Sequence, residues 1–202
     1  MTNASPPPGP LTGLRVIEVA DRIGQWCGKL MADFGAHVTK IEPLGGVAER
    51  RVGPFYQDVE HLDRSLYFWH YNTSKRSITL NLEREEGSDL FRTLVATADV
   101  LLETMQPGTL AALGLTYESL SAQNPSLVMC PLTPFGQYGP WRDYLTTDML
   151  HLAGGGQMAG SDYQPEDDPE YRPRSRLAAV MAGTCVPTTP TPPLLRHSTT
   201  AT

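Results

Sequence analysis

The sequence contains few cysteines and no cysteine pair. Only three occur among 202 residues, Cys27, Cys130 and Cys185, and they lie far apart in the chain. Such a set excludes a C-x-x-C metal or redox motif and is typical of reduced thiols that pack as small hydrophobic side chains. The five histidines show no metal-ligand spacing with one another or with the cysteines. We therefore expect no metal site.

Long apolar segments and basic tracts are also missing. The apolar runs, such as residues 100–102, are far too short to cross a bilayer. A net charge of −6 without a basic tract lacks the electrostatic pattern of a nucleic-acid-binding protein. Residues 1–10 hold neither the basic segment nor the apolar stretch of a signal peptide, which favours a cytosolic protein. We expect neither a membrane nor a nucleic acid as a partner.

Three common active-site motifs are absent. Residues 20–25, after the first expected strand, contain one glycine where a dinucleotide-binding fingerprint needs three. The glycines at 154–156 are not followed by the Gly-Lys-Ser/Thr of a phosphate-binding loop. No serine lies in a nucleophile-elbow pattern. These absences argue against the usual mode of NAD or FAD binding and against hydrolysis by a Ser-His-Asp triad.

What the sequence does contain is a regular alternation of strand and helix patterns. Strands are expected at residues 14–19, 37–42, 77–80, 99–103 and 127–130, and helices at 25–34, 84–98, 109–113 and 117–124. Residues 43–65 carry glycines, two prolines and many charges, and are expected to run over the surface. This alternation predicts an α/β fold with a mainly parallel sheet flanked by helices.

The length allows one sizeable core, and composition divides the chain into three parts. Residues 1–9 are expected to be a flexible leader, and residues 10–185 an α/β domain. Short helical patterns are expected from 148 to 152 and from 176 to 184. Residues 186–202 are almost wholly proline, threonine and small polar residues, which cannot build a packed core, so a disordered tail is expected there.

Several blocks of sequence occur in a fixed order and at characteristic spacing. They comprise residues 10–18, 30–43, 72–82, 98–103 with Pro107-Gly108, and a closing set at 113–115, 124–125 and 135–140. Together they resemble the beginning of class III CoA-transferases, the family that also contains the alpha-methylacyl-CoA racemases. The resemblance covers about residues 10–185. It implies the large, Rossmann-like domain of that family, incomplete at its C-terminus.

The resemblance implies an enzyme that acts on acyl-CoA and a small carboxylic acid, as a homodimer of interlinked subunits. CoA carries phosphates, so cations near strand ends, Arg22, Lys40, Lys75 and Arg76, are candidate partners for them. By the resemblance, Leu80, Leu82, Thr104 and Met105 match stretches that pass near the adenine and the pantetheine arm. Alternatives stay open for both sets. Each of the four cations is then a plain surface charge, and Leu80 and Met105 only pack the sheet.

The resemblance further implies an aspartate nucleophile, which forms an anhydride and then an aspartyl-CoA thioester. Alignment on Gly183 places Ala179 where that aspartate is expected. Asp148 is the remaining catalytic candidate, and the alternative is that it orients the nearby Gly-rich loop. Racemase relatives have a histidine where this chain has Thr147. Three hypotheses follow: a CoA-transferase, a non-catalytic CoA-thioester-binding relative, or an acyl-CoA racemase. Since family members are much longer, we also expect a fragment, made by truncation or by a change of reading frame.

Overall fold

A five-stranded parallel sheet forms the centre of the computed structural model, which describes residues 9–155. Its strands are β1 Arg15–Val19, β2 His37–Glu42, β3 Arg76–Thr79, β4 Val100–Glu103 and β5 Val128–Pro131. They lie in the order β3-β2-β1-β4-β5, and every neighbouring pair is parallel. The expected α/β fold with a parallel sheet is confirmed.

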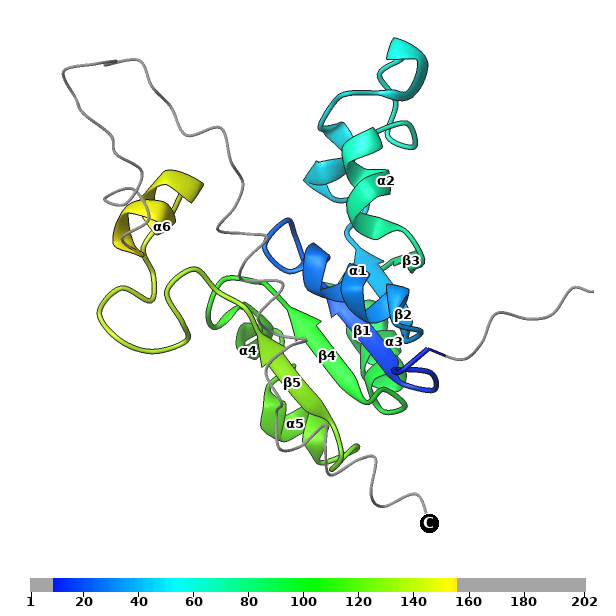
Figure 1. The fold of residues 1–202 in the computed structure, drawn as a ribbon. Coiled ribbons are helices and arrows are strands. Elements are labelled where there is room, and N and C mark those ends of the chain that lie inside the picture. Colours follow the sequence, from blue (N-terminus) through cyan, green and yellow to red (C-terminus); the bar gives the residue numbers. More distant parts are fainter. Residues whose placement is uncertain (1–8, 156–202) are drawn as a thin grey trace, which may run out of the picture.

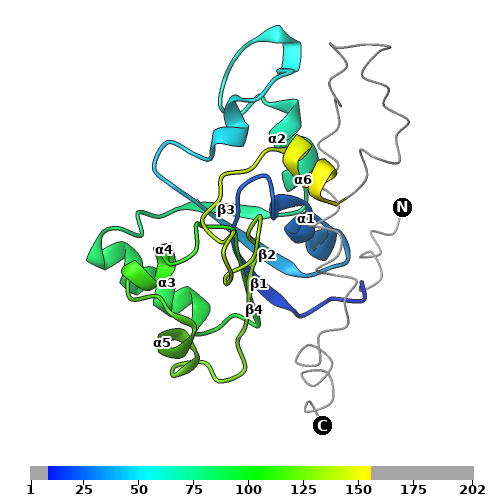
Figure 2. The same ribbon diagram turned by 90° about the vertical axis from the view of Figure 1, so that its left-hand side faces the viewer.

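Helices connect the strands and cover both faces of the sheet (Figures 1 and 2). The α-helices are α1 Gln25–Asp33, α2 Leu66–Asn72, α3 Glu85–Val95, α4 Thr109–Ala112, α5 Tyr117–Ser121 and α6 Asp148–Gly154. Two 3-10 helices, η1 Ala48–Arg51 and η2 Tyr56–Asp58, lie between β2 and α2. Figure 2 shows α1 on one side of the sheet and α3, α4 and α5 on the other.

Each face of the sheet has its own apolar core. Helix α1 packs Cys27 and Met31 against alternate residues of the strands, including Val16 and Leu102. The opposite core joins the strands to α3, α4 and α5, and its buried members include Ile17, Ile41, Phe91, Val95, Leu101, Leu110 and Leu120. Burial of one such aliphatic or aromatic side chain contributes about 1.5–3 kcal/mol. Because β4 is covered on both faces, its sequence is an uninterrupted apolar run until its last residue.

The expected surface excursion between β2 and β3 projects from the carboxyl edge of the sheet and ends in α2 (Figure 1). Ser65 begins α2 as its N-cap, because its hydroxyl oxygen accepts a hydrogen bond from Phe68 N at 3.0 Å. The same hydroxyl contacts the carbonyl oxygens of Val52 and Glu49 at 2.5 and 3.2 Å. One buried serine thus ties the excursion to the helix that follows it.

The ends of several elements differ from the expectation. The helix expected at 84–98 ends at Val95, because Ala96 and Thr97 start the turn into β4. Helix α6 continues to Gly154 rather than to 152. Residues 1–8 and 156–202, with the helix expected at 176–184 and the expected tail, lie outside the described residues. Within residues 9–155, no helix has the length and apolar character needed to cross a membrane.

Candidate functional site

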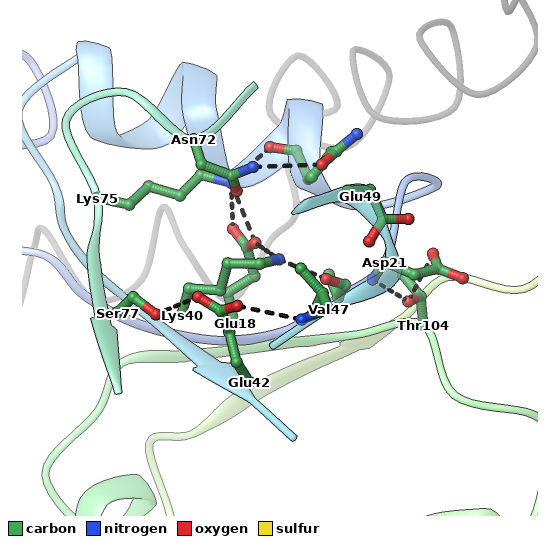
Figure 3. A network of polar contacts seen from close by, with 12 residues as sticks. Glu18, Asp21, Lys40, Glu42, Val47, Glu49, Asn72, Lys75, Ser77 and Thr104 are labelled. Atoms are coloured by element: carbon green, nitrogen blue, oxygen red, sulfur yellow. Dashed lines mark hydrogen bonds and ion pairs between the residues drawn. The ribbon is translucent and has the colours of Figure 1, made fainter. Parts of the chain in front are cut away.

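The candidate site lies at the carboxyl edge of the sheet, between β1 and β4. From β1 the chain first builds the sheet toward β3, and then returns to add β4 and β5 on the other side of β1. In open α/β sheets, such a switch point leaves a crevice beyond the strand ends where ligands bind. Residues 20–24, here named the β1–α1 loop, and Thr104 after β4 border this point (Figure 3).

The β1–α1 loop is joined directly to the end of β4. Asp21 N donates a hydrogen bond to Thr104 Oγ1 at 2.9 Å, and the Thr104 hydroxyl donates to Asp21 Oδ1 at the same distance. The same carboxylate oxygen accepts from Ile23 N at 2.9 Å. At Gly24 a Cβ atom would lie 2.6 Å from Thr104 Cγ2. The loop therefore closes against β4 so tightly that only glycine fits at this position.

On its other side, the loop contacts the excursion. Arg22 N donates to Glu49 Oε1 at 3.1 Å, and Glu49 is a buried residue of η1. The Arg22 side chain is exposed. The loop backbone is thus fixed from both sides, while the guanidinium of Arg22 stands at the edge of the sheet. The role of Arg22 as a phosphate partner stays a prediction.

A buried cluster of three charges, Glu18, Lys40 and Lys75, lies beneath the loop. Glu18 and Lys40 face each other on β1 and β2, and Lys40 Nζ lies 2.8 Å from Glu18 Oε1. Lys75 Nζ lies 2.8 Å from Glu18 Oε2. The three side chains are at most 2% exposed. Two ammonium groups around one carboxylate leave the buried cluster with a formal charge of +1.

Both lysines also bind the backbone at the two ends of the loop. Lys40 Nζ donates to Ala20 O at 2.5 Å, and Lys75 Nζ donates to Gln25 O at 2.7 Å. Lys75 Nζ further donates to Asn72 Oδ1 at 3.0 Å (Figure 3). Burial lowers the pKa of Lys75 to about 8, against the opposing attraction of Glu18. Both ammonium groups are therefore bound inside the protein instead of standing at its surface.

Arg76 lies on a different side of the molecule from Arg22. It lines a cavity of about 430 Å³ together with Arg15 and His37, which begin β1 and β2. Because parallel strands share one direction, these residues mark the amino edge of the sheet. The structure therefore does not bring the four predicted cations together at one site. Their role in binding CoA stays a prediction.

The apolar candidates lie at the carboxyl edge. Leu80 and Leu82 follow β3, and Met105 follows β4; all three pack partly buried against the core formed with α3, α4 and α5. Leu80 N donates to Glu42 O at 2.9 Å, which continues the sheet by one step beyond β3. These residues, Thr104 and Arg22 thus share one edge of the sheet. Whether they contact CoA stays a prediction.

A second ion pair fixes the excursion at the same edge. Glu42, the last residue of β2, accepts from Arg50 Nε at 2.6 Å and from Arg50 Nη2 at 2.7 Å, and it also contacts the Ser77 hydroxyl. Burial alone would raise the pKa of Glu42, but the hydrogen bonds from Arg50 and Ser77 outweigh it and lower the pKa to about 2. The guanidinium carbon of Arg50 also lies 3.9 Å from the centre of the Phe68 ring.

Asp148, the predicted catalytic candidate, is the first residue of α6. The preceding Thr147 caps this helix, because its hydroxyl oxygen accepts a hydrogen bond from Leu150 N at 3.4 Å. This contact gives a structural use for the threonine that stands where racemase relatives have histidine. Ala179, at the expected position of the nucleophile, lies outside the described residues. The catalytic assignment of Asp148 stays a prediction.

A larger cavity, of about 810 Å³, lies along the edge strand β5. Its walls are mostly apolar and include Leu110, Leu115, Leu127 and Met129. Glu103, the last residue of β4, also lines it, and burial raises the pKa of this carboxyl. Beyond β5 no further strand is paired within residues 9–155. The described residues also hold no group of three or more His, Cys, Asp or Glu side chains suited to a metal ion.

Cys27 does not provide a reactive thiolate. The thiol is fully buried, and burial raises its pKa to about 12, with further contributions from Cys130 and Glu18. A thiol with this pKa stays protonated at neutral pH and is a poor nucleophile. The interpretation of Cys27 as a small core residue fits this environment.

The most important polar residues of the site were not among the predicted ones. Glu18, Asp21 and Glu49 organise the β1–α1 loop, yet none was singled out from the sequence. One signal was present: β1 and β2 are apolar and β-branched, and each carries a charged residue of opposite sign near its end. A charge in a strand that is covered on both faces indicates a buried partner, because unpaired burial is costly.

Comparison with known proteins agrees with this geometry. The model of the family described as "CoA-transferase family III" matches residues 11–189. The chain is 38% identical over 172 residues to the succinyl-CoA:(R)-benzylsuccinate CoA-transferase subunit BbsE of Thauera aromatica, covering 82% of this chain and 42% of that protein. It is 42% identical over 163 residues to the succinate–glutarate CoA-transferase of Agrobacterium fabrum, covering 79% and 40%.

A solved structure supports the same assignment. The crystal structure of a CAIB/BAIF family protein from Brucella suis superposes with a TM-score of 0.75 at 34% identity, covering 94% of this chain and 50% of that one. The chain spans about two fifths of the length of these two curated relatives. The ordered blocks, the parallel sheet and the match over residues 11–189 lead to one conclusion: the chain belongs to CoA-transferase family III.

Proposed function

We propose that this chain provides the CoA-binding part of an enzyme that moves CoA between an acyl-CoA thioester and a carboxylic acid. The observation that carries the proposal is the family match over residues 11–189, together with relatives named as CoA-transferases at about two fifths identity. The fixed β1–α1 loop at the switch point supports it, because a preformed edge of this kind suits a bound nucleotide.

We further propose dicarboxylic acids as the substrate class. One relative is named for succinyl-CoA and a substituted succinate, and another for succinate and glutarate. An acyl group with a second carboxylate needs a cation in the site. Because Arg22 is kept here as a candidate phosphate partner, the substrate class rests on the names of these relatives alone. The cytosolic location and the homodimer expected from the sequence stay predictions.

A second function, a CoA-thioester-binding subunit without its own nucleophile, is favoured by one observation. Ala179 occupies the position where the resemblance expects the aspartate, and a methyl group cannot form an acyl anhydride. The relative from Thauera aromatica is itself named as a subunit. In this alternative a further chain would supply the nucleophile.

One experiment separates the two functions. The protein is incubated with succinyl-CoA and isotopically labelled glutarate, and the reaction is quenched with acid. The small products are separated from one portion, and the protein from a second portion is treated with hydroxylamine. Labelled glutaryl-CoA in the first portion, with CoA bound to the protein as a hydroxylamine-sensitive thioester in the second, supports the transferase. Binding of CoA without labelled product or adduct supports the non-catalytic subunit. Absence of both product and CoA binding would overturn the proposal.

A further inference from the structure

The ammonium group of Lys75 joins three elements at one point. Lys75 immediately precedes β3, and its Nζ contacts Glu18 on β1, the Gln25 carbonyl on α1 and Asn72 on α2. An ammonium group has three donors, and these contacts use all of them. Its side chain is 2% exposed. Lys75 therefore has neither a donor nor the exposure needed to contact a phosphate in solution.

What Lys75 does contact is the frame of the β1–α1 loop. The carbonyl groups at the two ends of the loop, Ala20 O and Gln25 O, are bound by Lys40 and Lys75 respectively. Both lysines share the carboxylate of Glu18. The position of the loop relative to the sheet thus depends on one buried cluster of charges (Figure 3).

The loop in turn presents the exposed groups at the carboxyl edge. Its backbone is bonded to Thr104 and Glu49 in the middle, the Asp21 carboxylate binds back to Ile23 N and Thr104, and the Arg22 side chain is exposed. A binding edge that is held in place before the ligand arrives loses less conformational entropy on binding. Release of one loop end therefore lowers affinity for a ligand at this edge without removing a ligand contact.

We propose that Lys75 is a positioning residue for the CoA site, which holds the β1–α1 loop through Glu18, Gln25 and Asn72 and does not touch CoA itself. This inference rests on the proposed function. It differs from the expectation that Lys75 pairs with a phosphate of CoA, and it assigns Lys40 the matching role at the other end of the loop.

The pH dependence of ligand affinity distinguishes a positioning role of Lys75 from a purely structural one, because Lys75 changes its charge near neutral pH. The titratable groups around it are Glu18 on β1, Lys40 on β2 and Cys27 on α1, with Asn72 on α2 as a neutral acceptor. With its pKa near 8, Lys75 loses its proton above neutral pH, and its hydrogen bonds to the loop lose their charge assistance. Affinity at the edge then falls as pH rises through 8.

The unfolding free energy changes in the opposite direction: the contribution of Lys75 to it rises with pH, whereas the affinity falls. The pKa of Lys75 is about 8 in the folded state and 10.5 in the unfolded chain, so the unfolded chain binds more protons between these values. The contribution of Lys75 to the unfolding free energy therefore rises from pH 8 to pH 10.5. Weaker binding together with unchanged or higher stability distinguishes loop positioning from loss of the fold.

Calorimetric titration with a CoA analogue that lacks the thiol tests the proposal. The analogue is needed because a free thiol itself titrates near pH 8.5. Wild type, Lys75→Met and the control Lys29→Met are compared at pH 7 and pH 9.5. Lys29 is a lysine of α1 that pairs with Asp33. We expect Lys75→Met to bind about tenfold more weakly at pH 7 than wild type, a loss of about 1.4 kcal/mol.

Between pH 7 and pH 9.5, wild type and Lys29→Met should lose affinity several-fold, whereas Lys75→Met should show a smaller change. Equal affinities and equal pH profiles for wild type and Lys75→Met would overturn the inference. Absence of analogue binding by wild type at both pH values would overturn the proposed function and this inference with it.

Hydrogen exchange of wild type covers the case in which Lys75→Met does not fold. After correction for the intrinsic rate, amides 21–25 should lose protection between pH 7 and pH 9.5, while amides of β4 keep theirs. Unchanged protection of the loop across this range would overturn the inference.

Discussion

Gly28 is the residue at which α1 approaches the buried cluster most closely. A Cβ atom there would lie 1.7 Å from Glu18 Oε2 and 3.2 Å from Lys75 Nζ. In an open helix, replacing glycine by alanine is favourable by about 1 kcal/mol, so the contact decides the sign of the effect. We expect Gly28→Ala to lower the unfolding free energy by about 1–3 kcal/mol, measured by urea denaturation.

Gly154 provides the matched control for this substitution. It is also helical, as the last residue of α6, but a Cβ atom there would meet no atom within 4 Å. Gly154→Ala should leave stability unchanged or slightly higher. Equal stability of the two variants would mean that α1 does not lie as close to Glu18 as described.

The ion pair between Glu42 and Arg50 makes stability depend on acid pH. The folded pKa of Glu42 is about 2, below its ordinary value of 4.5, so its contribution is complete above pH 4.5 and is lost as pH falls to 2. We expect Arg50→Met to lower the unfolding free energy at pH 7 by about 2 kcal/mol, because the buried carboxylate loses both guanidinium bonds.

The difference between wild type and Arg50→Met should shrink as pH falls from 4.5 toward 2, measured by urea denaturation at a series of pH values. Arg51→Met is the control, because the Arg51 guanidinium has a single contact, to Gly45 O at 3.2 Å. A pH-independent difference for Arg50→Met would contradict the role given to Glu42.

Single residues also show where sequence reasoning stopped. The sequence indicates that Lys40 and Lys75 are cations near strand ends, but it does not show that both side chains are buried. Their partner Glu18 lies 22 residues before Lys40 and 57 before Lys75. Local composition carries no information about pairing at such separations. The burial of these lysines follows only from the strand order and the register of β1 with β2.

Among the elements, α2 and the excursion before it depend on Ser65. This residue is fully buried, caps α2, and binds the Val52 and Glu49 carbonyl groups. We expect Ser65→Ala to lower the unfolding free energy by about 2 kcal/mol, since it removes a cap and leaves the buried Glu49 carbonyl and the part-buried Val52 carbonyl without this donor. Limited proteolysis should also cut residues 44–64 faster than in wild type.

Thr116→Ala is the comparison for this element. Thr116 caps α5 by accepting from Ser119 N at 3.2 Å, but the cap is exposed and far from the excursion. It should cost about 1 kcal/mol and leave cutting of residues 44–64 unchanged. Equal proteolysis of the excursion in both variants would argue against Ser65 as its anchor.

The order of the elements was predictable because their apolar periods differ. β4 is a continuous apolar run, whereas α3 repeats its buried residues at helical spacing. The ends were less predictable: residues 96–98 continue the helical composition, yet they turn toward β4. The sequence also did not show that β1 lies at the centre of the sheet, because that order depends on contacts between distant strands.

At the scale of the whole molecule, the sheet has two different edges. The carboxyl edge carries the fixed loop, Thr104 and the apolar residues after β3 and β4. The amino edge carries the cavity lined by Arg76. A third region, the 810 Å³ cavity along β5, is larger and mostly apolar. This cavity reaches the carboxyl edge at Glu103 and Gln106, which flank Thr104 and Met105. We place CoA at the carboxyl edge, at the switch point between β1 and β4.

Hydrogen exchange of the full chain with and without CoA tests this placement most directly. We predict that CoA slows exchange of amides in residues 20–24, 80–82 and 104–105, and leaves the amides of the amino edge and of β5 unchanged. Protection confined to residues around Arg76 or along β5, or no protection at all, would contradict it.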